Sequence, residues 1–186
     1  MSLFRTIVTL CAMTVLTVVG PAIAAPKPAV GTATTTSDAT RISTHLQRNL
    51  STLPWYGIFD NLEFKINGSQ VILSGQVTSE HAITKQDAEN VAKRIPGVTS
   101  VVNHIEVLPP SPFDSQLRRA AYRTIFSQSD LGRYTMGANP PVHIVVKNGH
   151  LILEGFVMNQ MDKTIAGLAA QSVAGLFSVT NNLRIG

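Results

Sequence analysis

The residues best suited to coordinate a metal ion are the five histidines. They are His45, His81, His104, His143 and His150. A helical metal site needs two histidines three or four residues apart, and no pair here has that spacing. His143 and His150 flank a predicted hairpin and could approach each other across it, but two exposed strand histidines explain them more simply. The sequence therefore predicts no metal centre and no cofactor.

Nucleophilic and phosphate-transfer chemistry leaves recognisable motifs, and none is present. The chain has no glycine-rich phosphate loop, no G-x-S-x-G elbow, no H-E-x-x-H and no G-x-G-x-x-G. Its only cysteine, Cys11, lies in an apolar N-terminal segment that we expect to be removed, which excludes disulfides and thiol catalysis. Acidic residues such as Glu80 and Glu89 are typical of a solvated helix face. We therefore expect a binding protein and not an enzyme.

Four arginines in the second half of the chain could bind anions: Arg118, Arg119, Arg123 and Arg133. Residues 113–186 carry seven basic and four acidic side chains, whereas residues 41–108 carry six of each. Because each basic charge gains about 1 kcal/mol near an anionic lipid surface, these arginines are a candidate lipid-binding site. The alternative is an ordinary solvated helix face. The modest net charge of +4 disfavours nucleic acid as a partner.

The segment that follows, residues 127–141, combines apolar residues with glycines and Arg133. Tyr134 and Met136 in such a loop could dip into a membrane interface. The alternative is that the loop folds back and covers the end of a helix. Trp55 in the first half of the chain poses the same choice, and there we expect packing under a sheet edge or against the other half.

An internal repeat organises the chain. IPGVTSVVNHIEV at 95–107 and VAGLFSVTNNLRI at 173–185 share their glycine, serine, valine and asparagine positions. Further upstream, VILSGQV at 71–77 matches LILEGFV at 151–157. The paired positions, all assigned a structural role, are Gly75 with Gly155, Gly97 with Gly175, and Asn103 with Asn181. An ordered series of matches at a nearly constant offset indicates a duplication, so we expect two tandem domains.

Each copy has the same order of expected elements. A helix (41–51 and 113–126) precedes a hairpin that turns at Asn-Gly (62–77 and 142–157), and a second helix and a last strand (101–107 and 179–185) follow. Ser79 and Asn159 are the expected caps of the second helices. A right-handed crossover makes the last strand parallel to the one before it. The predicted fold class is α+β: two tandem α-β-β-α-β domains, each a mixed three-stranded sheet with two helices on one face.

The last part of each copy explains why its glycine and asparagine recur. Gly97 and Gly175 end a helix, where glycine readily adopts the left-handed conformation. Asn103 and Asn181 lie among inward-pointing positions, so their amides need backbone partners near the helix end or the hairpin.

The outer face of the second sheet is apolar at Val145, Ile152 and Phe156. Apolar residues on neighbouring strands indicate a covered surface, and the cover is the first domain, a second molecule or a partner protein. The proline-rich linker at residues 109–112 is too short and stiff to separate the copies. Because domains of about 70 residues are marginally stable alone, we expect the two copies to pack together.

Residues 1–24 are typical of a secretory signal peptide. Arg5 supplies the positive charge, residues 6–19 are apolar, and AIA at 22–24 is a small-residue cleavage site. Since the apolar run is shorter than the roughly 20 residues of a spanning helix, cleavage after Ala24 is favoured over a retained membrane anchor. Residues 25–38 are rich in Pro, Ala and Thr and predict a flexible leader. These features predict export to the periplasm.

The repeated motif V-x-L-x-G-x-V, an Ala-rich helix and G-V-x-x-V-x-N-x-I resembles the BON domain, the bacterial osmotic-stress and nodulation module. It runs from Val71 to Ile105 and again, with close variants, from Leu151 to Leu183. The resemblance covers most of residues 41–186, with domains at 39–108 and 113–186. It implies a non-enzymatic envelope module associated with phospholipid-surface binding, envelope integrity and stress resistance. The loop at 127–141 is longer than its counterpart in the first copy and departs from the pattern.

Two functions follow from these observations. The leading hypothesis is an exported module whose second domain binds anionic phospholipid surfaces. The alternative is a periplasmic adaptor or chaperone-like protein that binds other envelope proteins through the outer face of the second sheet.

Overall fold

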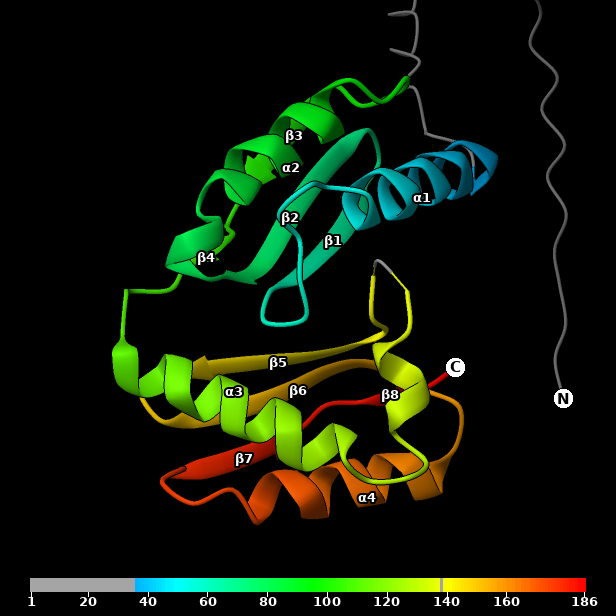
Figure 1. Cartoon of the computed structure of the whole chain (residues 1–186). Coiled ribbons are helices and arrows are strands. Elements are labelled where there is room, and N and C mark those ends of the chain that lie inside the picture. Colours follow the sequence, from blue (N-terminus) through cyan, green and yellow to red (C-terminus); the bar gives the residue numbers. More distant parts are fainter. Residues whose placement is uncertain (1–35, 138) are drawn as a thin grey trace, which may run out of the picture. The chain divides into compact units, whose positions relative to one another are not determined.

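A computed structural model describes residues 36–137 and 139–186 (Figure 1). The expected signal peptide at 1–24 and most of the expected leader at 25–38 lie outside the described residues. From residue 36 onward the described chain belongs to one compact unit. None of the helices described there is long and apolar enough to cross a bilayer.

Both copies show the predicted α-β-β-α-β order. The first contains α1 (Thr36–Ser51), β1 (Asn61–Asn67), β2 (Gln70–Val77), the 3₁₀ turn η1 (Ser79–His81), α2 (Ile83–Lys93), β3 (Ser100–Asn103) and β4 (Glu106–Val107). The second contains α3 (Pro112–Phe126), η2 (Gly132–Thr135), β5 (Val142–Lys147), β6 (His150–Val157), α4 (Gln160–Gln171), β7 (Ser178–Asn181) and β8 (Arg184–Ile185).

Each copy forms a mixed sheet, which confirms the predicted fold class. β1 is antiparallel to β2, and β3 and β4 are parallel to β2. β5, β6, β7 and β8 repeat this pairing. In Figure 1, α3 and α4 lie on the same side of the second sheet. Each copy also has its own apolar core, made from the inward stripes of its two helices and the alternate residues of its strands. Apolar residues recur every 3.6 positions in the helices and every 2 positions in the strands, so each element has one inward-facing apolar side.

The last strand, predicted as continuous, is interrupted in both copies by its asparagine. Asn103 Nδ2 donates to the Lys85 carbonyl (2.9 Å), and its Oδ1 accepts from the Ile105 N–H (3.1 Å). Asn181 makes the same bonds to the Lys163 carbonyl and the Leu183 N–H, at 2.8 and 3.2 Å. Because the side chain replaces a strand partner, the ladder breaks there and resumes at β4 or β8.

The helix starts differ in part from the prediction. Ser111 and Asn159 accept from the N–H groups of Asp114 (3.1 Å) and Asp162 (2.8 Å) and cap α3 and α4. The expected cap by Ser79 is wrong, because Ser79 opens the 3₁₀ turn η1 and the residue at the N-cap position of α2 is Ala82, which makes no side-chain cap bond. Helix α1 begins at Thr36, five residues before its predicted start, so residues 36–38 belong to it and not to the leader.

The repeated glycines lie where the backbone has positive φ. The angles are 111° at Gly75, 96° at Gly97, 109° at Gly155 and 92° at Gly175. The two copies also contact each other. The Ile144 N–H of β5 donates to the Ile58 carbonyl of the first copy (2.8 Å), and Phe59 packs against the core of the second.

Candidate functional site

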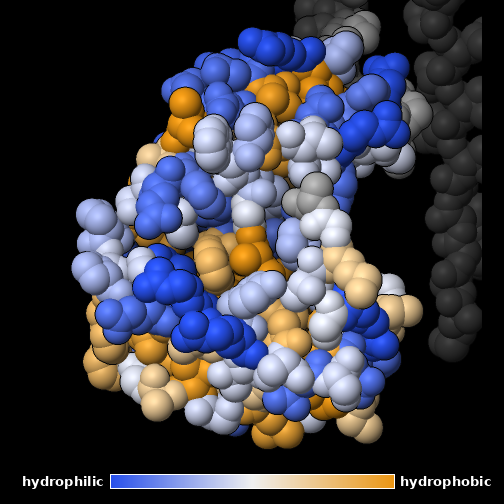
Figure 2. Space-filling view, in the orientation of Figure 1, coloured by the Kyte–Doolittle hydropathy of each residue, from blue (hydrophilic) through white to orange (hydrophobic). Residues whose placement is uncertain are grey.

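Helix α3 presents two exposed arginines beside a shallow groove. Arg119 and Arg123 lie one turn apart, and among the described ion pairs neither guanidinium has a partner. The groove has a volume of about 430 Å³ and is lined by Phe113, Gln116, Leu117, Arg119, Ala120, Arg123 and Ala174. We call it the α3 groove. Figure 2 shows hydrophilic side chains gathered over α3, with hydrophobic ones beside them. The α3 groove therefore places two positively charged side chains next to apolar ones.

Arg118 does not belong to this exposed surface, contrary to the sequence prediction. Its side chain is only 6% exposed, and its Nη2 donates to the Val146 carbonyl of β5 (2.6 Å). Burial lowers the pKa of Arg118. The reason is helical geometry, because Arg118 precedes the buried Ala121 and Ile125 by three and seven residues and so shares their face.

Tyr134 is likewise not a membrane-facing tip, and the loop folds back as the alternative interpretation held. The Tyr134 hydroxyl donates to Asp162 Oδ2 and accepts from the Met158 N–H (2.8 Å), and its ring is buried. Arg133 also pairs with Asp162. The hydrogen bond from Tyr134 has the largest effect on the pKa of Asp162 and lowers it, and the hydrogen bond from Arg133 lowers it further. The η2 turn therefore holds the start of α4. Of the three lipid-binding residues predicted in this loop, Tyr134 is buried, Arg133 is paired with Asp162, and Met136 is 77% exposed.

The predicted partner surface is only partly exposed. Val145 is buried and Ile152 half-buried, whereas Phe156 is exposed, with the Arg184 guanidinium 4.3 Å from its ring centroid. Trp55 is 58% exposed, so the expected packing of this ring is wrong. The neighbouring Tyr56 turns inward in its place.

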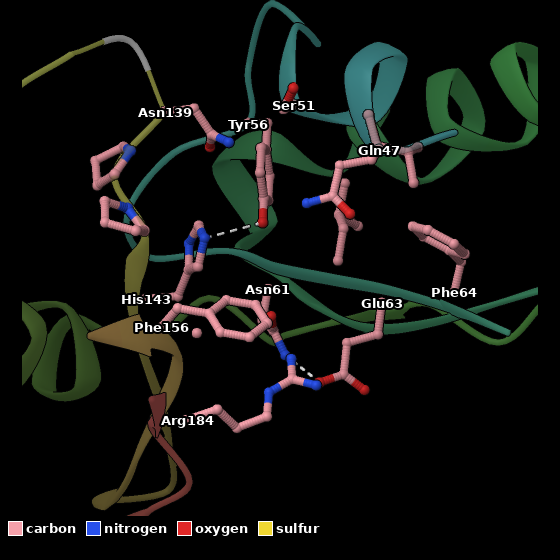
Figure 3. A pocket seen from close by; sticks show the side chains of 15 residues that line it. Gln47, Ser51, Tyr56, Asn61, Glu63, Phe64, Asn139, His143, Phe156 and Arg184 are labelled. Atoms are coloured by element: carbon pink, nitrogen blue, oxygen red, sulfur yellow. Dashed lines mark hydrogen bonds between the residues drawn. The ribbon is translucent and has the colours of Figure 1, made fainter. Parts of the chain in front are cut away.

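A second groove lies between the two copies, around Tyr56 and His143 (Figure 3). It has a volume of about 450 Å³. Its walls include Gln47, Leu50, Tyr56, Glu63 and Phe64 of the first copy and Pro141, His143, Phe156 and Arg184 of the second. The Tyr56 hydroxyl and His143 Nε2 are 3.1 Å apart and hydrogen-bonded. His143 is thus a buried contact between copies and not an exposed strand residue, and the first copy covers it.

Burial governs the protonation of this pair. It raises the pKa of Tyr56 to about 12. It lowers the pKa of His143 below its usual value, against smaller opposing effects of the Gly57 backbone and the Asp60 carboxylate. The folded protein therefore favours neutral His143.

We expect the free energy of unfolding to fall as the pH drops below about 6.5, the pKa of an unfolded histidine. The unfolded chain then binds a proton that folded His143 takes up only at lower pH. The His143→Gln variant should show a flatter pH dependence than the parent in urea denaturation at pH 7.5 and pH 5.5. An unchanged slope in this variant would show that His143 is not the titrating group.

A third pocket lies between η1 and the start of α3, and we call it the η1–α3 pocket. Its volume is about 480 Å³. It is lined by Phe59, Thr78, Ser79, Glu80, His81, Pro110, Ser111, Pro112, Ser115, Gln116, Arg118 and Arg119. Arg119 thus borders both this pocket and the α3 groove.

The wall of the η1–α3 pocket depends on Asp60, which the sequence analysis missed. Its carboxylate is fully buried and accepts from the N–H groups of Gly57 (3.0 Å) and Thr78 (2.8 Å). The Thr78 hydroxyl (3.2 Å) and His81 Nδ1 (2.6 Å) also contact it. An acid inside the apolar stretch GIFDNLEF was the available signal. Among the described residues, no group of three or more His, Cys, Asp or Glu side chains could hold a metal ion.

Comparisons with known proteins identify the repeated unit. A family model described as BON domain matches residues 38–109 and 128–186, more than half of the chain. The interval between the matches contains α3. A search of curated proteins found no match.

Two similar solved structures are of CdsD, a structural protein of the type III secretion system of Chlamydia trachomatis. The structure of its C-terminal domain is 15% identical, with 77% of this chain and 96% of that chain covered and a TM-score of 0.31. The other is 15% identical, with 78% and 93% covered and a TM-score of 0.29.

Proposed function

The chain belongs to the BON-domain family, and from this premise we propose that it is an exported, non-enzymatic module that binds anionic phospholipid surfaces. BON domains are known from envelope and phospholipid-binding proteins and are generally non-catalytic. In this proposal the protein acts in the periplasm, where it supports envelope integrity or resistance to osmotic stress.

The observation that carries the proposal is the α3 groove. Arg119 and Arg123 are exposed and unpaired among the described ion pairs, so their charge is available to an external anion. Phe113 beside them is 48% exposed. Guanidinium groups bind phosphate in a bidentate manner, and an adjacent aromatic ring can enter the headgroup region. A phospholipid surface offers phosphate groups to the two arginines and a headgroup region to the Phe113 ring.

Vesicle sedimentation tests this function. The protein should bind vesicles of phosphatidylcholine with phosphatidylglycerol, and the binding should fall as salt rises. The double variant Arg119→Glu/Arg123→Glu should bind at least about thirtyfold more weakly, since two charges contribute about 1 kcal/mol each.

The matched control is Arg48→Glu/Arg94→Glu, which makes the same charge change at exposed sites of the first copy. It should retain most of the binding. Equal loss in both double variants, or equal binding to neutral vesicles in high salt, would show that the α3 groove is not the lipid site.

A second candidate function is an adaptor that binds another envelope protein. Phe156 favours it, because this exposed ring lines the groove between the copies together with Arg184. In a pull-down from envelope extract, Phe156→Glu should lose a partner while vesicle binding stays unchanged. Vesicle binding that falls with Phe156→Glu would argue against a separate protein-binding face.

A further inference from the structure

The η1–α3 pocket contains a buried positive charge, that of Arg118, which has no counter-ion among the described residues. An arginine carries five N–H donors. Nη2 of Arg118 is well bonded, but its Nη1 lies 3.5 Å from the Ser115 hydroxyl and its Nε has no partner. Among the described ion pairs, none includes Arg118. A buried, incompletely bonded guanidinium is unusual because buried charges are normally paired.

Two of the acids that attract Arg118, Asp114 and Asp60, are already committed to other donors. Both carboxylate oxygens of Asp114 accept backbone N–H groups, from Asn148 (2.9 Å) and Gly149 (2.8 Å). Asp60 is held by the donors described above. These two carboxylates and that of the exposed Glu80 attract Arg118 at a distance, but none of them forms a described ion pair with it. The charge therefore has no close counter-ion in the described part of the chain and is available to an external anion.

The rest of the pocket wall fits an anion. Arg119 lines it beside Arg118, and His81 and the hydroxyl-bearing Ser111 and Ser115 add polar groups. The pocket also lies at the start of α3, a helix of 15 residues whose N-terminal end favours negative charge. Glu80, which is exposed, is the one acidic residue in the lining and opposes binding.

We infer that the η1–α3 pocket binds a phosphate group, held by Arg118 and Arg119. Phosphate matches the planar donor fork of arginine and supplies the missing counter-charge. The group is either a free phosphate or the phosphodiester of a lipid headgroup. This site shares Arg119 with the α3 groove but differs from it elsewhere, because Arg118 and His81 line only the pocket and Arg123 lines only the groove. Its failure and the failure of the lipid proposal are therefore distinguishable.

Isothermal titration and thermal unfolding test the site with inorganic phosphate at constant ionic strength, with chloride as the reference. Phosphate should bind saturably and raise the Tm of the parent protein, since a ligand of the folded state stabilises it. Arg118→Met should fold at least as stably without phosphate, because an apolar side chain replaces an unpaired buried charge. It should bind phosphate at least tenfold more weakly and show no Tm increase.

Two further variants separate the pocket from its surroundings. Glu80→Gln should strengthen phosphate binding by removing the opposing charge, and Arg94→Glu, at an exposed site of the first copy, should leave it within about twofold. Saturation by inorganic phosphate identifies the free anion as a ligand. Saturation only by soluble dihexanoyl phosphatidylglycerol, abolished by Arg118→Met, identifies the lipid headgroup. Either result supports the site.

Three outcomes would overturn the inference. They are a Tm increase in Arg118→Met equal to that of the parent, weaker phosphate binding by Glu80→Gln, and binding lost with Arg123→Glu but kept with Arg118→Met. The last result would assign the anion to the α3 groove.

Discussion

Replacement of Gly155 by alanine is expected to reduce the free energy of unfolding by at least about 3 kcal/mol. The backbone there has φ of 109°, which strains any residue with a Cβ. An added Cβ would also lie 2.0 Å from the Pro141 carbonyl oxygen, a backbone atom that accepts from the Phe156 N–H. Strand β6 or the start of β5 must therefore move. Urea denaturation followed by circular dichroism measures the loss.

Gly137 provides the matched control for this effect. Its φ is 100°, but an added Cβ would meet no atom within 4 Å. Gly137→Ala should therefore cost only the backbone strain, about 1 kcal/mol. Gly75→Ala should behave like Gly155→Ala, because its Cβ would lie 2.1 Å from the Asn61 carbonyl oxygen. Equal losses at Gly155 and Gly137 would show that close approach is not what requires glycine.

The Asp60→Ala variant is expected to lose about 3 kcal/mol of stability. The substitution removes the acceptor of two backbone N–H groups, and each buried donor left unsatisfied costs about 1–3 kcal/mol. It also removes the carboxylate that contacts Nδ1 of His81, a residue of the η1 turn. Chemical denaturation should show the loss, and amide exchange should quicken at Gly57 and Thr78, whose N–H groups lose their acceptor.

Asp130 is the control for removal of an acidic side chain, since it is exposed in the loop after α3. Asp130→Ala should change stability by less than about 0.5 kcal/mol. If Asp60→Ala lost no more than this control, the carboxylate would not be what anchors η1.

The two copies use different groups at the same backbone position. The Thr78 N–H, just after β2, donates to Asp60, whereas the Met158 N–H, just after β6, donates to the Tyr134 hydroxyl. The second copy has proline where the first has Asp60, so its longer loop supplies the acceptor from η2. The duplicated fold thus retains the requirement for an acceptor while the residue that meets it has changed.

The order of elements and the mixed sheets could be predicted from the sequence because they depend on local patterns. Alternation in VILSGQV and LILEGFV reports which strand face is buried, and the helical stripe of Leu117, Ala121 and Ile125 does the same for α3. Because the same pattern occurs in both copies, the elements predicted for one copy support those predicted for the other. The same stripe also contained the signal that Arg118 faces inward, although its charge suggested an exposed position.

The tertiary structure alone decided which polar groups meet. Tyr56 and His143 are 87 residues apart in the chain, and Arg118 and Val146 are 28 apart. No local periodicity relates such positions, because their contact depends on how separate elements pack. For the same reason, the inward turn of Tyr56 beside exposed Trp55 and the clamp of Tyr134 on Asp162 became visible only when the chain was folded. The sequence by itself determined the α-β-β-α-β order of the two copies, whereas packing between distant segments determined which residues line the pockets.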